Sequence, residues 1–261
     1  MRRLALALLL AGAPACASPP PELAAATAAP FDATHAALDA LLARHVIVGR
    51  VAYEALAAER PALDAYLAGL AGPSEATVAA WPRDEQLAFW INAYNALTLR
   101  VVLENRPIDS IKSIGLLPYA AFRAPVATLR ARPAPLSLDD IEKGILLKEL
   151  GEPRVHFAVS CASVGCPALL SRAWRGDDLD ATLDASTRAF LADTTKNQWD
   201  PATRTLRLSR IFEWYAADFE AAAGSVPAFV ATYAPPDMKA GIAAGNFTIV
   251  HLDYDWALNT R

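Results

Sequence analysis

Residues 155–167 read VHFAVSCASVGCP, and the predicted fold and candidate site are both organised around this stretch. It opens with an alternating apolar run that carries His156, and it continues into small residues that hold Cys161 and Cys166. The alternation predicts a strand in which His156 faces away from the core. Pro167 suits the first turn of a helix, which would place Cys166 at the N-cap. The stretch therefore predicts a strand, a tight loop and a helix start, with a histidine and two thiols at the junction.

The composition is that of a globular protein, with 54% hydrophobic residues, 20% charged residues and a net charge of −4. Proteins that bind nucleic acid usually carry a strongly basic surface, so we predict no nucleic-acid partner. The acidic balance also disfavours an anionic membrane face as the main partner. Neither an internal repeat nor a second domain is visible, so we expect one domain over residues 31–261.

Residues 1–17 have the pattern of a secretory signal: two arginines, an apolar run over residues 4–11 and the small-x-small sequence Ala13-Pro14-Ala15. We therefore expect export, to the periplasm of a bacterium. Cys16 stands where a bacterial lipoprotein carries its lipidated cysteine. Two alternatives follow, a lipid anchor on Cys16 or a plain cleaved signal, and that anchor would be the only membrane attachment. Residues 18–30 are rich in Pro and Ala and indicate a tether.

The spacing of apolar residues predicts helices for much of the chain. The longest covers residues 85–104, where the apolar stripe follows helical spacing, and it should be the central buried helix. A second begins at a capping-box spacing from Ser137 and ends near Gly151. Short strands are predicted at 205–208 and 246–253. We expect an α+β fold, a single helix-rich domain with a long central helix packed on a small, mainly antiparallel sheet.

The long helix contains three candidate binding residues, Asn92, Tyr94 and Asn95. Asparagine is unfavourable inside a helix, and a buried amide must find hydrogen-bond partners. Asn92 and Asn95 lie on one side of the helix, so they form a polar seam that either fixes a neighbouring loop or lines a pocket.

The cysteines allow two kinds of chemistry. A thiolate at Cys161, with Cys166 as second choice, could act as a nucleophile with His156 as its base. In an unbroken strand His156 and Cys161 would lie on opposite faces and about 16 Å apart, so the chain must turn at or before Ser160 for them to meet. Alternatively, Cys161 and Cys166 form a disulfide, which export favours, or remain two unbridged buried thiols. The spacing does not resemble a structural zinc site, and we predict neither a metal nor a cofactor.

Four motifs resemble the family known as domain of unknown function 547. They are FWINAYNAL at 89–97, LSLDDIE at 136–142, the segment 156–167, and YDWALN at 254–259. The family carries no established reaction, and its members occur in exported bacterial proteins and in fusions in plants and animals. His251, followed by Asp253 and Asp255, is an alternative base, but it lies outside the family pattern. The resemblance therefore favours His156 as the base and Glu142 as the group that orients it. Lys143 stands where relatives often have His, so this chain departs from the family pattern at that position.

Two functions remain open at this stage. In the first, the protein would be a thiol-dependent enzyme of acyl or amide chemistry, in which Cys161, His156 and Glu142 carry the reaction. Alternatively, it is a non-catalytic envelope protein that binds a small molecule or peptide, with a structural disulfide between Cys161 and Cys166.

Overall fold

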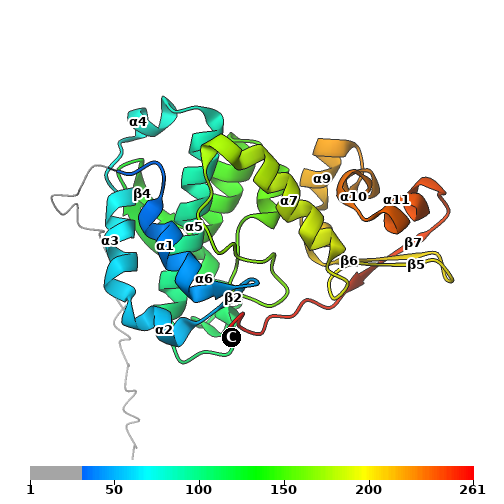
Figure 1. Ribbon diagram of the computed structural model, residues 1–261, viewed down its shortest axis with the longest axis horizontal. Helices are drawn as coiled ribbons and strands as arrows, with labels where there is room; N and C mark the ends of the chain where they lie inside the picture. The colour runs from blue at the N-terminus through cyan, green and yellow to red at the C-terminus, as the bar shows by residue number, and fades with distance from the viewer. Residues whose placement is uncertain (1–30) are drawn as a thin grey trace, which may run out of the picture.

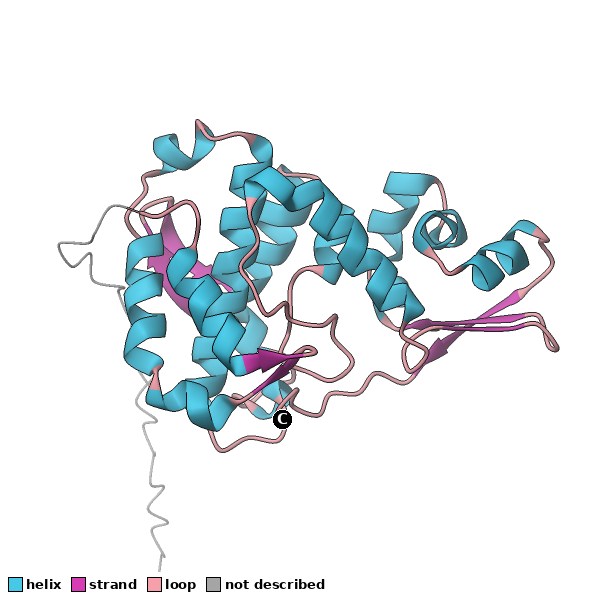
Figure 2. Ribbon diagram, in the orientation of Figure 1, coloured by secondary structure: helices cyan, strands magenta, loops and turns pink. Residues whose placement is uncertain are grey.

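The computed structural model describes residues 31–261, which form a single α+β domain made mainly of helices (Figures 1 and 2). The predicted signal, tether and lipidation site fall in residues 1–30 and lie outside the described residues. No helix in the described part of the chain is long and apolar enough to cross a membrane.

The first part of the domain is a group of helices around α5. It consists of α1 (Ala36–His45), the hairpin β1 (Val46–Ile47) and β2 (Arg50–Val51), α2 (Tyr53–Ala58), α3 (Arg60–Leu70), α4 (Glu75–Ala79) and α5 (Arg83–Asn105). The long helix predicted over 85–104 is confirmed, and every residue from Leu87 to Val102 is buried. It packs mainly against α3, η2 (Asp140–Glu149) and η4 (Gly176–Asp178) and meets the strand β3 (Pro125–Leu129), so helices rather than a sheet enclose most of it.

The middle of the chain wraps α5 with short elements. These are η1 (Ile111–Ser113), α6 (Ala120–Arg123), the hairpin β3 (Pro125–Leu129) and β4 (Arg132–Ser137), and η2 (Asp140–Glu149). At the start of η2, Asp140 N donates to Ser137 Oγ over 3.1 Å and Ser137 N donates to Asp140 Oδ2 over 2.8 Å. This reciprocal pair is the predicted capping box, with Asp in place of Glu. The helix is a π-helix that ends at Glu149. Gly151 follows two residues later, with a φ of 64° that is the left-handed conformation common after a helix C-terminus.

The last part of the domain combines helices with a three-stranded sheet. It consists of η4 (Gly176–Asp178), α7 (Leu179–Ala192), β5 (Gln198–Asp200), β6 (Thr205–Ser209), α8 (Ile211–Trp214), α9 (Ala216–Ala223), α10 (Val226–Tyr233), α11 (Pro236–Ala243) and β7 (Thr248–Leu252). β6 lies between β5 and β7, antiparallel to the first and parallel to the second. The other two sheets, β1–β2 and β3–β4, are antiparallel hairpins. The sheets are thus small and mainly antiparallel, as predicted.

The strand predicted at residues 155–160 is wrong. The chain forms the 3-10 helix η3 (Pro153–Phe157) there, and it begins where the Glu152 side chain accepts a hydrogen bond from Arg154 N over 3.1 Å. Pro153 favours this helical first turn. All residues from Val155 to Ser160 are buried, His156 included, so their alternation did not mark one exposed face and one buried face.

The helix predicted after Pro167 is also wrong. Residues 167–174 run without a helix; Leu169 forms an isolated bridge with Gly49, and Trp174 is bound by its backbone to Asn92. Cys166 therefore caps no helix, and the helix-dipole argument for an activated Cys166 thiolate fails.

η3 joins the two hydrophobic clusters of the domain. Val155 packs in the larger cluster, around α5, and Phe157 packs in the smaller one, with Phe190, Phe212 and Phe219. His156 stands between these two neighbours in the sequence. The stretch that begins at residue 155 therefore places His156 at the seam between the clusters, where ligand pockets are common.

Candidate functional site

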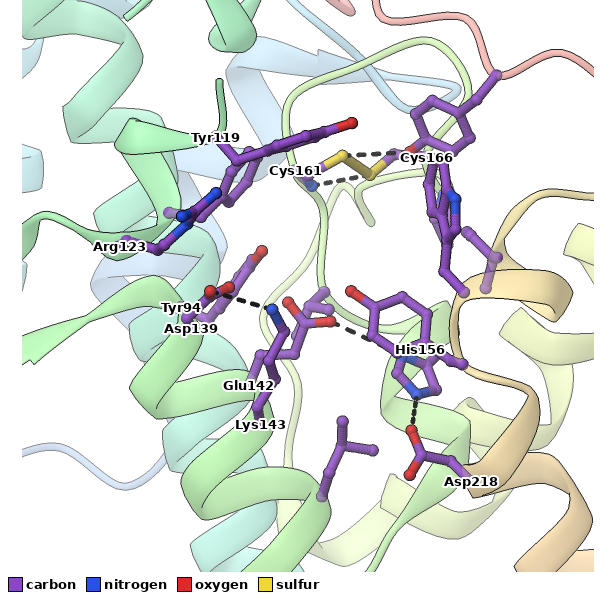
Figure 3. Close-up of a pocket in the computed structure, with 18 of the residues that line it drawn as sticks. Tyr94, Tyr119, Arg123, Asp139, Glu142, Lys143, His156, Cys161, Cys166 and Asp218 are labelled. Carbon is purple, nitrogen blue, oxygen red and sulfur yellow. Dashed lines mark hydrogen bonds and ion pairs between the residues drawn. A yellow bond between two sulfur atoms is a disulfide. The ribbon is translucent and has the colours of Figure 1, made fainter. Parts of the chain in front are cut away.

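A pocket of about 920 Å³ lies along this seam. Its residues come from six regions that are distant in the sequence: α5, α6, η2, the 156–167 stretch, α8–α9 and the C-terminal tail. The lining includes Tyr94, Tyr119, Phe122, Arg123, Asp139, Glu142, Lys143, Lys148, His156, Cys161, Cys166, Trp214, Tyr215, Asp218, Tyr254 and Trp256 (Figure 3). Of the predicted site residues, the pocket brings together Tyr94, Glu142, His156 and both cysteines.

His156 lies between two carboxylates. Its Nε2 is 2.9 Å from Asp218 Oδ2, and its Nδ1 is 3.7 Å from Glu142 Oε1 (Figure 3). Glu142 was expected beside His156, and the structure places it there. Asp218, the closer partner, was not predicted, because 62 residues separate it from His156 and no motif marks it.

His156, Glu142 and Asp218 form a charged trio, and the pKa values of His156 and Glu142 are set by burial and by the neighbouring charges. Burial alone would lower the pKa of His156, but the hydrogen bond to Asp218 and the Glu142 carboxylate outweigh it, so the pKa of His156 is raised. Burial would raise the pKa of Glu142, but the neighbouring His156 outweighs it and lowers that pKa. The two shifts agree in describing an imidazolium held between two carboxylates.

Tyr94 and Tyr215 stay protonated beside Glu142. Burial and the Glu142 carboxylate raise the pKa of both hydroxyls well above the usual value. Tyr215 also lies against the imidazole, with ring centroids 4.0 Å apart. The floor of the pocket is thus a charged trio packed against neutral phenols.

The two cysteines are joined in a disulfide at another wall of the pocket. Of the three alternatives left open for Cys161 and Cys166, the structure has the bridged one. Figure 3 shows the disulfide on a different side of the pocket from the ring of His156, whose edge points to Asp218. Both ring nitrogens face carboxylates, so the structure does not form the Cys161–His156 pair that a thiol nucleophile needs.

Asn92 and Asn95 do not line the pocket. Asn92 Nδ2 donates to Trp174 O over 2.8 Å, and Trp174 N donates to Asn92 Oδ1 over 2.9 Å. Asn95 binds the backbone of residues 158–160 in the same way, through Ala158 O at 3.1 Å and Ser160 N at 2.8 Å. Both amides have donor and acceptor bound to backbone, so the polar seam fixes the neighbouring loops.

Aromatic rings surround the mouth of the pocket. Trp214, Tyr254 and Trp256 contact one another with centroids 4.6–5.8 Å apart, and Tyr119 packs edge-on against Trp256 at 5.5 Å. Trp214 is 45% exposed, so its face is open to solvent. Trp214 belongs to the 211–219 segment and Tyr254 and Trp256 belong to the C-terminal motif, but nothing in the sequence placed these two segments side by side.

Three basic side chains, Arg123, Lys143 and Lys148, lie in the lining. Lys143 Nζ is paired with Asp139 Oδ2 at 3.0 Å, and Arg123 Nη2 donates to Pro118 O over 3.0 Å. Within residues 31–261, no group of three or more His, Cys, Asp or Glu side chains is arranged to hold a metal ion. The aromatic and apolar side chains of the lining suit an organic ligand with an aromatic or apolar body, and the three basic side chains are the groups that an anionic substituent could meet.

The fold and the site define an α+β domain with an aromatic pocket that a disulfide closes on one side. Residues 78–191 match the family model described as "Protein of unknown function, DUF547", which supports the family assignment made from the motifs. The matched segment contains α5, η2, η3 and both cysteines; it ends before Asp218 and the tail motif. No curated protein and no solved structure matches the chain.

Proposed function

We propose that this protein binds a small molecule or a short peptide in the pocket. The observation that carries the proposal is the arrangement of His156 and the cysteines. Both ring nitrogens face carboxylates, and the sulfurs are bonded to each other, so the oxidised protein offers neither a thiolate nor a ring nitrogen free to accept a proton. The pocket itself is open and large enough for a ligand.

Thiol-dependent acyl or amide chemistry at Cys161 would require two changes. The disulfide would have to be reduced, and His156 would have to leave Asp218 to reach a sulfur. The 2.9 Å bond between Nε2 and Asp218 opposes the second change. The geometry therefore favours binding over catalysis by a free thiol.

We also propose that the protein is exported to the bacterial cell envelope. The signal-like pattern of residues 1–17 supports export. So does the disulfide, since such bonds persist mainly in oxidising compartments. Anchoring through a lipid on Cys16 is part of this proposal.

The test uses 8-anilinonaphthalene-1-sulfonate, a fluorescent probe that combines aromatic rings with an anionic group. We expect saturable binding to the oxidised wild-type protein. Ala217→Trp places a large ring in the lining and should weaken the affinity by at least about tenfold. Ala222→Trp is the matched control: it lies on the same helix, is exposed and is absent from the pocket lining, so the affinity should not change. Absence of saturable binding, or equal affinity in the two variants, would refute the proposal.

A further inference from the structure

Both sulfurs of the disulfide have hydrogen-bond donors beside them. Cys161 Sγ lies 2.8 Å from Ser163 Oγ and 3.2 Å from Tyr254 OH. Cys166 Sγ accepts a hydrogen bond from Cys161 N over 2.8 Å. These contacts come from the loop between the cysteines, which holds Ser163, and from the C-terminal tail, which holds Tyr254.

A donor beside a sulfur has little to stabilise in a neutral disulfide, but it stabilises a thiolate strongly. Hydrogen-bond donors that already lie beside the sulfurs in the oxidised protein therefore favour the reduced form and make each sulfur a better leaving group. Tyr254 remains a donor at neutral pH, because burial raises the pKa of its hydroxyl. A bridge that served only to hold a loop would gain nothing from these three donors.

The two sulfurs differ in access. Both cysteines line the pocket, but Cys166 is buried, with 5% of its surface exposed, whereas Cys161 is partly exposed. A molecule in the pocket thus meets Cys161 first. The buried sulfur is the one that accepts the backbone N–H, as the leaving group of an exchange would.

We propose that the pocket admits low-molecular-weight thiols and that its disulfide exchanges with them. The thiolate of the incoming molecule attacks Cys161 Sγ and forms a mixed disulfide, and the bond to Cys166 breaks, with its electron pair leaving on Cys166 Sγ. A second thiol then attacks the mixed disulfide, which yields the small-molecule disulfide, and the two protein thiolates take up the two protons released by the thiols. Two thiols are oxidised and one protein disulfide is reduced; the reverse reaction uses the small-molecule disulfide as oxidant. The proposal rests on the ligand-binding function above and names a thiol as its substrate class.

The equilibrium is measured with glutathione. Oxidised full-length protein is equilibrated in mixtures of reduced and oxidised glutathione, the free thiols are alkylated, and intact mass and peptide mapping give the reduced fraction at Cys161 and Cys166. We expect reversible reduction of the native protein at millimolar reduced glutathione. The double variant Ser163→Ala/Tyr254→Phe loses both donors to Cys161 and should require at least roughly tenfold more reductant. Tyr233→Phe, on α10 and absent from the pocket lining, is the control and should behave as wild type.

Single cysteine variants test which sulfur is attacked. Cys166→Ser leaves Cys161 as the reacting thiol, and Cys161→Ser leaves Cys166. Oxidised glutathione should form a mixed disulfide with Cys161 about tenfold faster than with Cys166, because Cys166 is buried. Faster reaction at Cys166 would overturn the assignment. A bridge that resists glutathione until urea unfolds the protein, or a double variant that matches wild type, would overturn the proposal itself.

The sulfonate probe separates this proposal from the one on which it rests. Saturable probe binding by a protein whose bridge resists glutathione would leave the binding function standing and refute only the exchange. Absence of probe binding would refute the binding function directly.

Discussion

Replacing His156 with glutamine removes the imidazolium that separates Glu142 from Asp218. The side chain of Glu142 is only 8% exposed, so its carboxylate loses a charge partner that water cannot replace. Removing one partner of a buried ion pair typically costs about 3–5 kcal/mol. Asp218 is 37% exposed and is hydrated after the change, so we assign most of the loss to Glu142.

A second substitution gives this prediction its sharpest form. In wild type, Glu142→Gln should destabilise the protein, because it breaks the pair with His156. In the His156→Gln background the same change should stabilise the protein, because it removes the unpaired buried charge. The sign of the effect of Glu142→Gln therefore reverses between the two backgrounds.

Urea unfolding of the four proteins at pH 6.5, followed by circular dichroism, measures these free energies. Lys239→Gln in both backgrounds is the control, since this side chain is exposed on α11 and does not line the pocket. If the effects of His156→Gln and Glu142→Gln simply added, the buried charged trio would not exist as described.

Three further predictions concern the same site. The pKa of His156 is raised above its unfolded value near 6.5, so its stabilisation is complete below that pH and is lost as the pH rises through the folded pKa. The free energy of unfolding of wild type should therefore decline as the pH rises above about 6.5 and through the folded pKa, and an identical decline in His156→Gln would contradict this. Asn95→Ala leaves two buried backbone groups of residues 158–160 unbonded and should cost about 2–4 kcal/mol in urea unfolding; Asn105→Ala, at the partly exposed end of the same helix, should cost less than about 1 kcal/mol, and equal losses would refute the role of Asn95. Reduction of the disulfide should lower the free energy of unfolding by roughly 2 kcal/mol, as expected for a short closed loop. Loss of cooperative unfolding on reduction would contradict this, because the domain would then depend on the bridge to fold.

The sequence predicted the elements whose patterns are local. The central helix has a long apolar stripe with clear ends, and η2 begins at a capping box and is followed by a glycine with positive φ. These patterns involve residues that are close together in the sequence, so the structures that they predict do not depend on how distant segments pack.

The strand prediction failed at a short segment, residues 155–160, in which every residue is buried. Around Val155 and Phe157 the alternation was read as two faces of a strand, but neighbours in η3 pack into different hydrophobic clusters, so apolar side chains are needed on all sides. A short apolar run of this kind does not distinguish a strand from a helical turn.

The candidate site was predicted in part. Glu142 and His156, from two of the four motifs, meet as the resemblance implied, and both cysteines lie on the same pocket. Asp218 and the aromatic mouth were missed, because α8, α9 and the tail reach the pocket only through the tertiary fold. Asp218 and Glu220 flank the buried Phe219 in a helix that is otherwise alanine, and these charged side chains were the signal that could have drawn attention to α9.

The central claim is that the site is a pocket closed by a disulfide, with no free thiol nucleophile. The most direct test treats the native, full-length protein with iodoacetamide before and after reduction and locates the adducts by peptide mapping. We predict no adduct at Cys161 or Cys166 before reduction and adducts at both after it. Alkylation of Cys161 in the native protein before reduction would contradict the claim and would restore the thiol-dependent reaction.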